Sequence, residues 1–111
     1  MMRMAVSPSA AALLRALIAR ACADRDRILL MDVHSTDWQS LTFTGERHQI
    51  ALRVAGRDSA EIVERMCDGL ADAEFSIAGL LVADIGVAGS TRRKPDGATE
   101  LTIEALTITD N

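Results

Sequence analysis

Two segments of the chain repeat apolar residues at the spacing of an amphipathic helix. The first stripe, at i, i+1, i+4, i+5 and i+8, consists of Leu13, Leu14, Leu17, Ile18 and Ala21. The second has the same spacing and consists of Ile62, Val63, Met66, Cys67 and Leu70. Residues at these offsets share one side of a helix, which predicts one helix over about residues 8–23 and a second from about residue 58. Because the stripes match, both helices can pack on the same face of a sheet.

Start signals agree with both helices. Ser7 can accept the first free amide of the first helix, and Pro8 suits its first position because proline has no amide to satisfy. Asp58 is expected to cap the second helix, with Glu61 reaching back to the free amide. We also expect Glu61 to pair with Arg65 on the exposed side of that helix.

The remaining apolar residues predict strands. Residues 28–33 form an apolar run compatible with a short buried strand. Two alternating runs follow on either side of residues 44–47, namely Leu41 and Phe43, then Ile50, Leu52 and Val54. They predict a hairpin with one face toward the core and the other toward water or a partner.

A second hairpin is predicted over residues 77–87 and 101–108, where Pro95-Asp96-Gly97 supplies a strong turn signal. Its first strand contains Leu80, Leu81 and Val82, which are apolar on both faces. A strand of this kind is covered on each side by the core or by another subunit, so this segment is our candidate subunit interface. In the last strand Leu101 and Ile103 are out of phase with Leu106 and Ile108, which predicts a bulge near Glu104 and Ala105.

These elements predict the order α-β-β-β-α-β-β in a single α+β domain over residues 1–111. Two helices would cover one face of a mainly antiparallel sheet of four to five strands. The chain has one tryptophan, two phenylalanines and no tyrosine, so aliphatic side chains must build the core. Cys22 and Cys67 lie on the helix stripes, where we expect small buried hydrophobes and no disulfide.

The charge balance disfavours two classes of partner. Sixteen acidic residues against twelve Lys and Arg give a formal net charge of -4, which disfavours general nucleic-acid binding. Arg15 and Arg20 interrupt the apolar N-terminal stretch, and no uncharged run approaches the roughly 18 residues of a membrane span. We therefore expect a cytoplasmic protein without a membrane partner.

The candidate chemistry is sparse. Asp32 and His34 alternate along a possible strand and His48 could join them, which leaves a small metal-dependent hydrolase as one alternative. The simpler interpretation is a solvated strand end without metal. Neither cysteine has a neighbouring base, and neither a nucleophile elbow nor a phosphate loop is present, so we expect no enzyme, no catalytic residues and no cofactor.

One basic cluster occurs, formed by Arg92, Arg93 and Lys94 beside the second turn. Three adjacent cations could meet phosphate or the carboxylates of a protein partner, with protein contact favoured, or could form a solvated hairpin tip.

Four short motifs follow one another over residues 37–107. They are Asp37-Trp38; Thr44-Gly45-Glu46-Arg47-His48 with Ile50, Leu52 and Val54; the helix from Ala60 to Leu70; and Ala78 to Val82, which leads to Thr91-Arg92-Arg93-Lys94-Pro95-Asp96-Gly97 and to Leu101, Ile103, Ala105 and Thr107. In order and spacing they resemble the tail terminator, or tail-completion, family of long-tailed phages and phage-derived gene transfer agents. The family's Pro- and aromatic-rich stretch before the first hairpin is missing here, and Ala55-Gly56-Arg57 stands where a Trp is common.

The resemblance implies a structural virion-assembly protein without a cofactor. It implies an oligomeric ring of six subunits that caps the tail tube protein, stops its growth and faces a head-side connector protein. Isolated subunits of such a ring can be monomers. Arg92, Arg93 and Lys94 would then contact the tube or a neighbouring subunit, and DNA would pass through an acidic ring that repels it. A small oligomeric protein-binding domain unrelated to phage is the other alternative.

Overall fold

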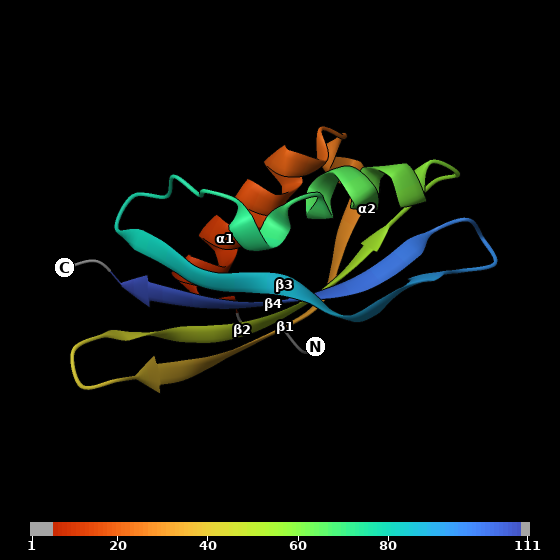
Figure 1. Ribbon diagram of the computed structural model, residues 1–111. Coiled ribbons are helices and arrows are strands. Elements are labelled where there is room, and N and C mark those ends of the chain that lie inside the picture. The colour runs from red at the N-terminus through yellow and green to blue at the C-terminus, as the bar shows by residue number, and fades with distance from the viewer. Residues whose placement is uncertain (1–5, 110–111) are drawn as a thin grey trace.

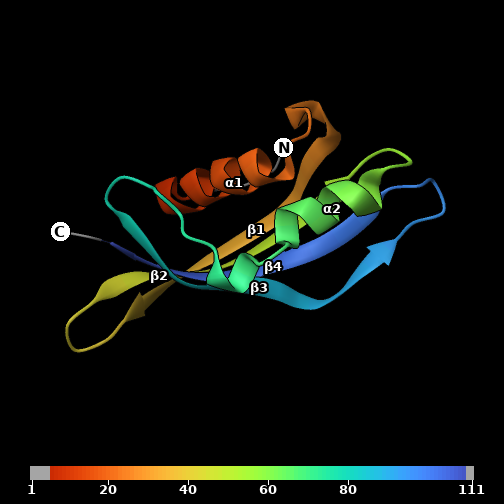
Figure 2. The same cartoon turned by 45° about the horizontal axis from the view of Figure 1, so that its top comes forward.

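The chain folds as two helices over one face of an antiparallel sheet, which confirms the predicted α+β class. The computed structural model describes residues 6–109. The main elements are α1 (Pro8–Ala21), β1 (Ile28–Gln39), β2 (Thr44–Val54), α2 (Ser59–Cys67), β3 (Leu80–Arg93) and β4 (Thr99–Thr109), with short 3-10 turns η1 (Arg25–Arg27) and η2 (Leu70–Asp72). The strands are ordered β1-β2-β4-β3, every neighbouring pair is antiparallel, and both helices lie on the same side (Figures 1 and 2).

The core lies between the helices and the sheet and is almost entirely aliphatic. Leu13 and Leu17 of α1 and Ile62 and Met66 of α2 are at most 1% exposed. The strands contribute Ile50, Leu52, Val54, Ile85, Leu101 and Ile103, all in the same buried cluster. Since burying one such side chain contributes roughly 1.5–3 kcal/mol, this layer supplies most of the drive for folding.

Two arginines join the helices through their C-terminal carbonyl groups. Nε of Arg20 in α1 donates to the carbonyl oxygen of Met66 at 3.1 Å, and Nε of Arg65 in α2 donates to the carbonyl oxygen of Ala21 at 3.0 Å. Each helix thus satisfies the free acceptors at the other's end. Arg65 therefore bonds to α1, not to Glu61 as its spacing predicted.

The helix termini differ in part from the expected caps. Ser7 does cap α1, since its Oγ accepts from the amide of Ala10 at 3.2 Å. Asp58 makes no side-chain bond to the amides of α2, because its carboxylate binds Arg27 instead. The expectation that both cysteines are buried is wrong for Cys22, which follows α1 in the left-handed conformation with φ 53° and is exposed, while Cys67 is half-buried and both are free thiols.

The first hairpin is longer than predicted and turns elsewhere. Residues 28–39 form one twelve-residue strand with a bulge at Met31, where we expected a short strand and then a second one through Leu41 and Phe43. The turn is residues 40–43, and the expected turn at 44–47 lies within β2. Leu41 is fully exposed, so its apolar alternation with Phe43 does not mark a strand.

The bulge predicted near Glu104 and Ala105 is also absent, because β4 pairs with β2 without interruption from Thr99 to Ile108. The irregularities lie in β3, between Val82 and Asp84 and between Ala88 and Arg92. Leu106 and Ile108 are out of phase with Leu101 and Ile103 because they occupy the opposite face of the sheet.

Candidate functional site

The helices leave one face of the sheet uncovered, and this open face is the candidate functional surface. Side chains paired directly across neighbouring antiparallel strands lie on the same face, so the register defines rows across it. From one end to the other, the rows run from β1 through β2 and β4 to β3 as follows: Trp38, Gly45, Ile108, Leu81; Thr36, Arg47, Leu106, Asp84; His34, Gln49, Glu104, Gly86; Asp32, Ala51, Thr102, Ala88; and Leu29, Arg53, Glu100, Arg92.

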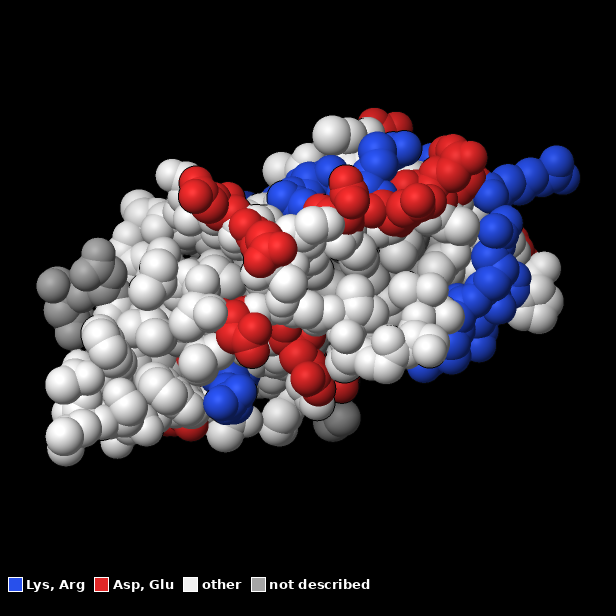
Figure 3. Space-filling model, viewed as in Figure 1, with Lys and Arg blue, Asp and Glu red and all other residues white. Residues whose placement is uncertain are grey.

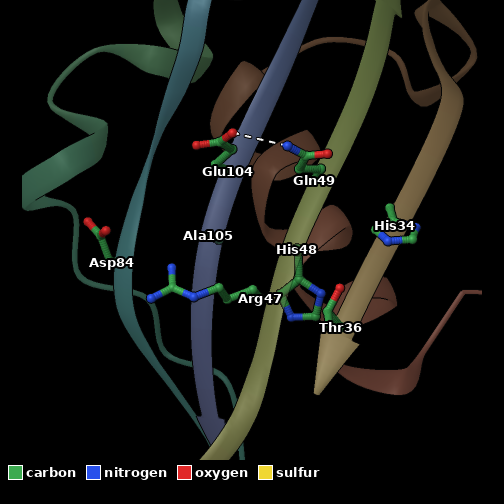
Figure 4. Close-up of a pocket in the computed structure, with 8 residues that line it drawn as sticks. All are labelled: His34, Thr36, Arg47, His48, Gln49, Asp84, Glu104 and Ala105. Atoms are coloured by element: carbon green, nitrogen blue, oxygen red, sulfur yellow. Dashed lines mark hydrogen bonds between the residues drawn. The ribbon is translucent and has the colours of Figure 1, made fainter. Parts of the chain in front are cut away.

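The middle rows line a depression with a volume of about 470 Å³. Its exposed polar side chains come from all four strands and are His34, Thr36, Arg47, Gln49, Asp84 and Glu104, and the buried residues His48 and Ala105 also line it. Figure 4 shows the Arg47 side chain crossing β4 toward β3, where Asp84 lies. Nε2 of Gln49 donates to Oε1 of Glu104 at 3.1 Å. Since all six of these side chains are exposed, the depression is a hydrogen-bonding surface open to water and does not enclose a reacting group.

Although His48 lines the depression, its side chain belongs to the helix-covered side of the sheet, away from Asp32 and His34. Its register partners Ser35 and Ala105 are on the helix-covered side, and it is 2% exposed. Its Nδ1 is hydrogen-bonded to Oγ of Ser35 at 2.7 Å, and its Nε2 to Oγ1 of Thr107 at 2.8 Å. Burial lowers the pKa of His48 below its ordinary value of 6.5, which keeps the ring neutral.

The three residues of the candidate metal site therefore lie on two faces. Asp32 and His34 are on the open face, and His48 is on the helix-covered face. Among the residues that the structure describes, no group of three or more His, Cys, Asp and Glu side chains is placed to hold a metal ion. Between residues 6 and 109, no helix has the length and apolar character needed to cross a bilayer.

The basic cluster lies at the far end of the sheet and is not isolated. Glu100 is within 3.7 Å of Arg92 and 4.0 Å of Lys94, and it also accepts from Arg53 at 2.9 Å. Arg93 contacts only backbone among the described residues, donating to the carbonyl oxygen of Arg57 at 3.0 Å. Figure 3 shows Lys and Arg side chains gathered at this end of the molecule, where the β3–β4 turn lies.

A charged turn links this cluster to the rest of the sheet. Arg53 also pairs with Asp96, and the amide of Ala98 donates to Oδ1 of Asp96 at 3.0 Å. The amide of Ala98 lowers the pKa of Asp96 most, and the charge of Arg53 lowers it further. The hydroxyl of Ser59 donates to the carbonyl oxygen of Gly97 at 2.6 Å, so the turn is held to the start of α2.

The candidate interface segment opens β3, at the edge of the sheet. Leu81 is on the open face with 57% of its surface exposed. Val82 points to the other side and packs partly against the core, and Leu80 is half-buried. The segment is therefore apolar on both faces as the sequence indicated, but within residues 6–109 only one side packs against the core.

Sequence reasoning missed that this segment is one end of an apolar row. Trp38, Ile108 and Leu81 share a row with Gly45. Gly45 adds no side chain to this row, and a Cβ on it would overlap the carbonyl oxygen of Thr107. The turn residues Leu41 and Phe43 extend the same end of the molecule. The sequence contained a signal for this row. Leu106 and Ile108 alternate out of phase with Leu101 and Ile103, which we interpreted as a bulge instead of a second apolar face.

A scan against protein-family models finds no match, and searches of curated proteins and of solved structures find none either. The resemblance to tail terminators thus comes from the ordered motifs of the sequence.

Proposed function

We propose that this chain is a structural assembly subunit that joins copies of itself edge to edge into a ring, in the manner of a phage-like tail terminator. The observation that supports this most is the pair of long sheet edges, β1 with twelve residues and β3 with fourteen. Within residues 6–109, no strand pairs with the outer side of either one. Free edges of this length present rows of unsatisfied amides and carbonyls, which favour pairing with another chain.

The strand directions favour a repeating contact. Four strands alternate in direction across the sheet, so β1 and β3 run oppositely. When β3 of one copy lies beside β1 of the next, the new pair is antiparallel like the other three. The contact joins two different surfaces and leaves a free edge at each end, so it can repeat until a rotation closes the ring.

The charge and the motif order support the more specific function. A ring at the end of a tail tube must let DNA pass without holding it, and each copy adds a formal charge of -4, which repels a polyanion. The motifs over residues 37–107 appear in the order typical of tail terminators. The ring would cap the tube protein and meet a head-side connector, with Arg92, Arg93 and Lys94 contacting acidic groups of the tube or a neighbouring subunit.

The test is to compare particles produced with and without this chain by electron microscopy. We expect tails of uncontrolled length without it, and normal lengths when the unaltered chain is supplied in trans. Tails of normal length in its absence would contradict the proposal. Capsid and tail genes beside its own would exclude the alternative of a protein-binding domain unrelated to phage.

A further inference from the structure

The end of the sheet that carries the β1–β2 turn has a group of apolar side chains outside the core cluster. We call the apolar end the set formed by Trp38, Leu41, Phe43, Leu81 and Ile108. Leu41, Phe43 and Leu81 are 102%, 53% and 57% exposed, respectively, whereas Trp38 and Ile108 are half-buried. Two of the chain's three aromatic residues lie here, although the core is otherwise aliphatic. Exposed apolar groups that cluster in this way typically mark an interaction surface.

The apolar end differs in charge from the rest of the surface. Figure 3 shows few charged side chains at this end of the molecule and many over the helices and at the opposite end. The β1–β2 hairpin extends beyond the helices in Figure 1, so the helix layer does not cover its turn. A surface with few charges loses little hydration energy when it is buried against another apolar surface.

We propose that the apolar end is a docking surface for a second copy of this chain, in which Leu81 of one copy packs against Trp38 of the next. This inference rests on the proposed edge-to-edge assembly and adds its register. Trp38 and Leu81 lie in one row of the sheet, on the same face but on opposite edges. The chain thus presents both halves of the contact at the same height.

In a ring, two residues that share a row on opposite edges of the sheet meet across the interface between neighbouring copies. Rotation about an axis parallel to the strands moves every residue without changing its height along the axis. Leu81 on the β3 edge of one copy therefore comes level with Trp38 on the β1 edge of its neighbour. The row would continue from copy to copy as an apolar band at one end of the ring, through Trp38, Gly45, Ile108 and Leu81.

Gly45 contributes to the band because it leaves β2 without a side chain between Trp38 and Ile108. A Cβ at this position would overlap the carbonyl oxygen of Thr107 in β4, so the close approach of the two central strands requires glycine. The open space above Gly45 lies beside Trp38, and both residues line a depression at this end of the sheet with Asp37, Gln39 and Thr44.

Cysteine cross-linking tests the register in the full-length chain. In a background of Cys22→Ser and Cys67→Ser, Trp38→Cys with Leu81→Cys places thiols on the two edges in one row. The matched control, Leu29→Cys with Leu81→Cys, uses the same two edges but separates the thiols by nine residues along β1, roughly 30 Å. Under mild oxidation we expect a ladder of covalent oligomers from the first pair and monomers from the control.

The outcomes separate the register from the proposed function. Cross-linking of the control pair alone would show that the edges join in another register, which overturns this inference and leaves ring assembly standing. A lack of cross-links in both pairs, in purified protein at high concentration and in assembled particles, would overturn the inference itself. Normal tails without the chain would overturn the proposed function whatever the cross-linking result.

Trp38 also provides a readout that needs no substitution at its own position, because it is the only tryptophan. We expect its emission to shift to shorter wavelength, and quenching by acrylamide to fall, as protein concentration rises. Leu81→Asp should weaken the apparent association by at least about tenfold, equivalent to about 1.4 kcal/mol. Gln49→Lys, on a central strand of the same face, is the matched control and should associate normally. Equal association by Leu81→Asp and the unaltered chain would contradict the proposed contact.

Discussion

The two faces of the sheet carry apolar side chains for different reasons. On the covered face, Leu52 and Ile103 are 0% exposed and pack beneath both helices. On the open face, Leu81 in β3 and Ile108 in β4 lie on the side of the sheet away from both helices. An apolar pattern alone therefore does not identify a core, because a core requires a second layer that packs against it.

Truncation of a core side chain is expected to have the largest effect on stability. Leu52→Ala removes buried methyl groups and leaves a cavity, which should lower the free energy of unfolding by about 2–5 kcal/mol. Leu81→Ala, on the open face, should change it by no more than about 0.5 kcal/mol. Urea unfolding of dilute protein measures both. Equal losses would show that the open face is covered within the chain.

The two histidines offer the next comparison, since His48 lies on the covered face and His34 on the open face. His48→Phe would leave the hydroxyls of Ser35 and Thr107 without their partner, and we expect a loss of about 1–3 kcal/mol in the free energy of unfolding. His34→Asn changes an exposed side chain and should stay within about 0.5 kcal/mol of the unaltered chain. A similar loss of stability in His48→Phe and His34→Asn would contradict the conclusion that only His48 is buried.

The lowered pKa of His48 also predicts the direction of a pH effect. As pH falls through 6.5, the ordinary pKa of this residue, the unfolded chain binds a proton that the folded chain does not bind until lower pH. The folded state should therefore lose stability between pH 6.5 and the lowered pKa, and the loss should level off below that pKa. Chemical unfolding at a series of pH values measures this slope. The slope should be smaller in His48→Phe, and an unchanged slope would assign it to another group.

The sequence predicted the covered face better than the open one. The stripes of α1 and α2 and the alternation of Ile50, Leu52 and Val54 follow directly from burial, which acts on every second or every third to fourth residue. Their common face and the α+β class were accordingly predictable. Register was not, since it depends on which strands become neighbours. The sheet order β1-β2-β4-β3 could not be obtained from local pattern.

The errors at the candidate site have the same physical origin. Leu41 and Phe43 alternate like a strand, but they form a turn because β1 continues to Gln39 and the hairpin must reverse after it. Leu106 and Ile108 suggested a bulge because we assumed that every apolar residue of β4 faces the core. His48 lies on the opposite face from Asp32 and His34, because the pairing of β1 with β2, including the bulge at Met31, decides which face each residue takes.

The smallest effect on folding is expected in the basic cluster at the end of the sheet, and it distinguishes a partner contact from an internal one. Arg93→Glu removes a cation whose contact within the described residues is one hydrogen bond to the carbonyl oxygen of Arg57, so stability should change by no more than about 0.5 kcal/mol. Arg92→Glu is the matched control, because Arg92 lies within 3.7 Å of Glu100 and its reversal also places two like charges together. If the cluster meets acidic groups of a partner, both variants should weaken tube capping and do so more strongly at low salt, where charges are screened least. Reversal of Arg92, Arg93 and Lys94 together, without any change in ring formation or capping, would restrict this cluster to its contacts with Glu100 and the Arg57 carbonyl and leave the apolar end as the surface on which assembly depends.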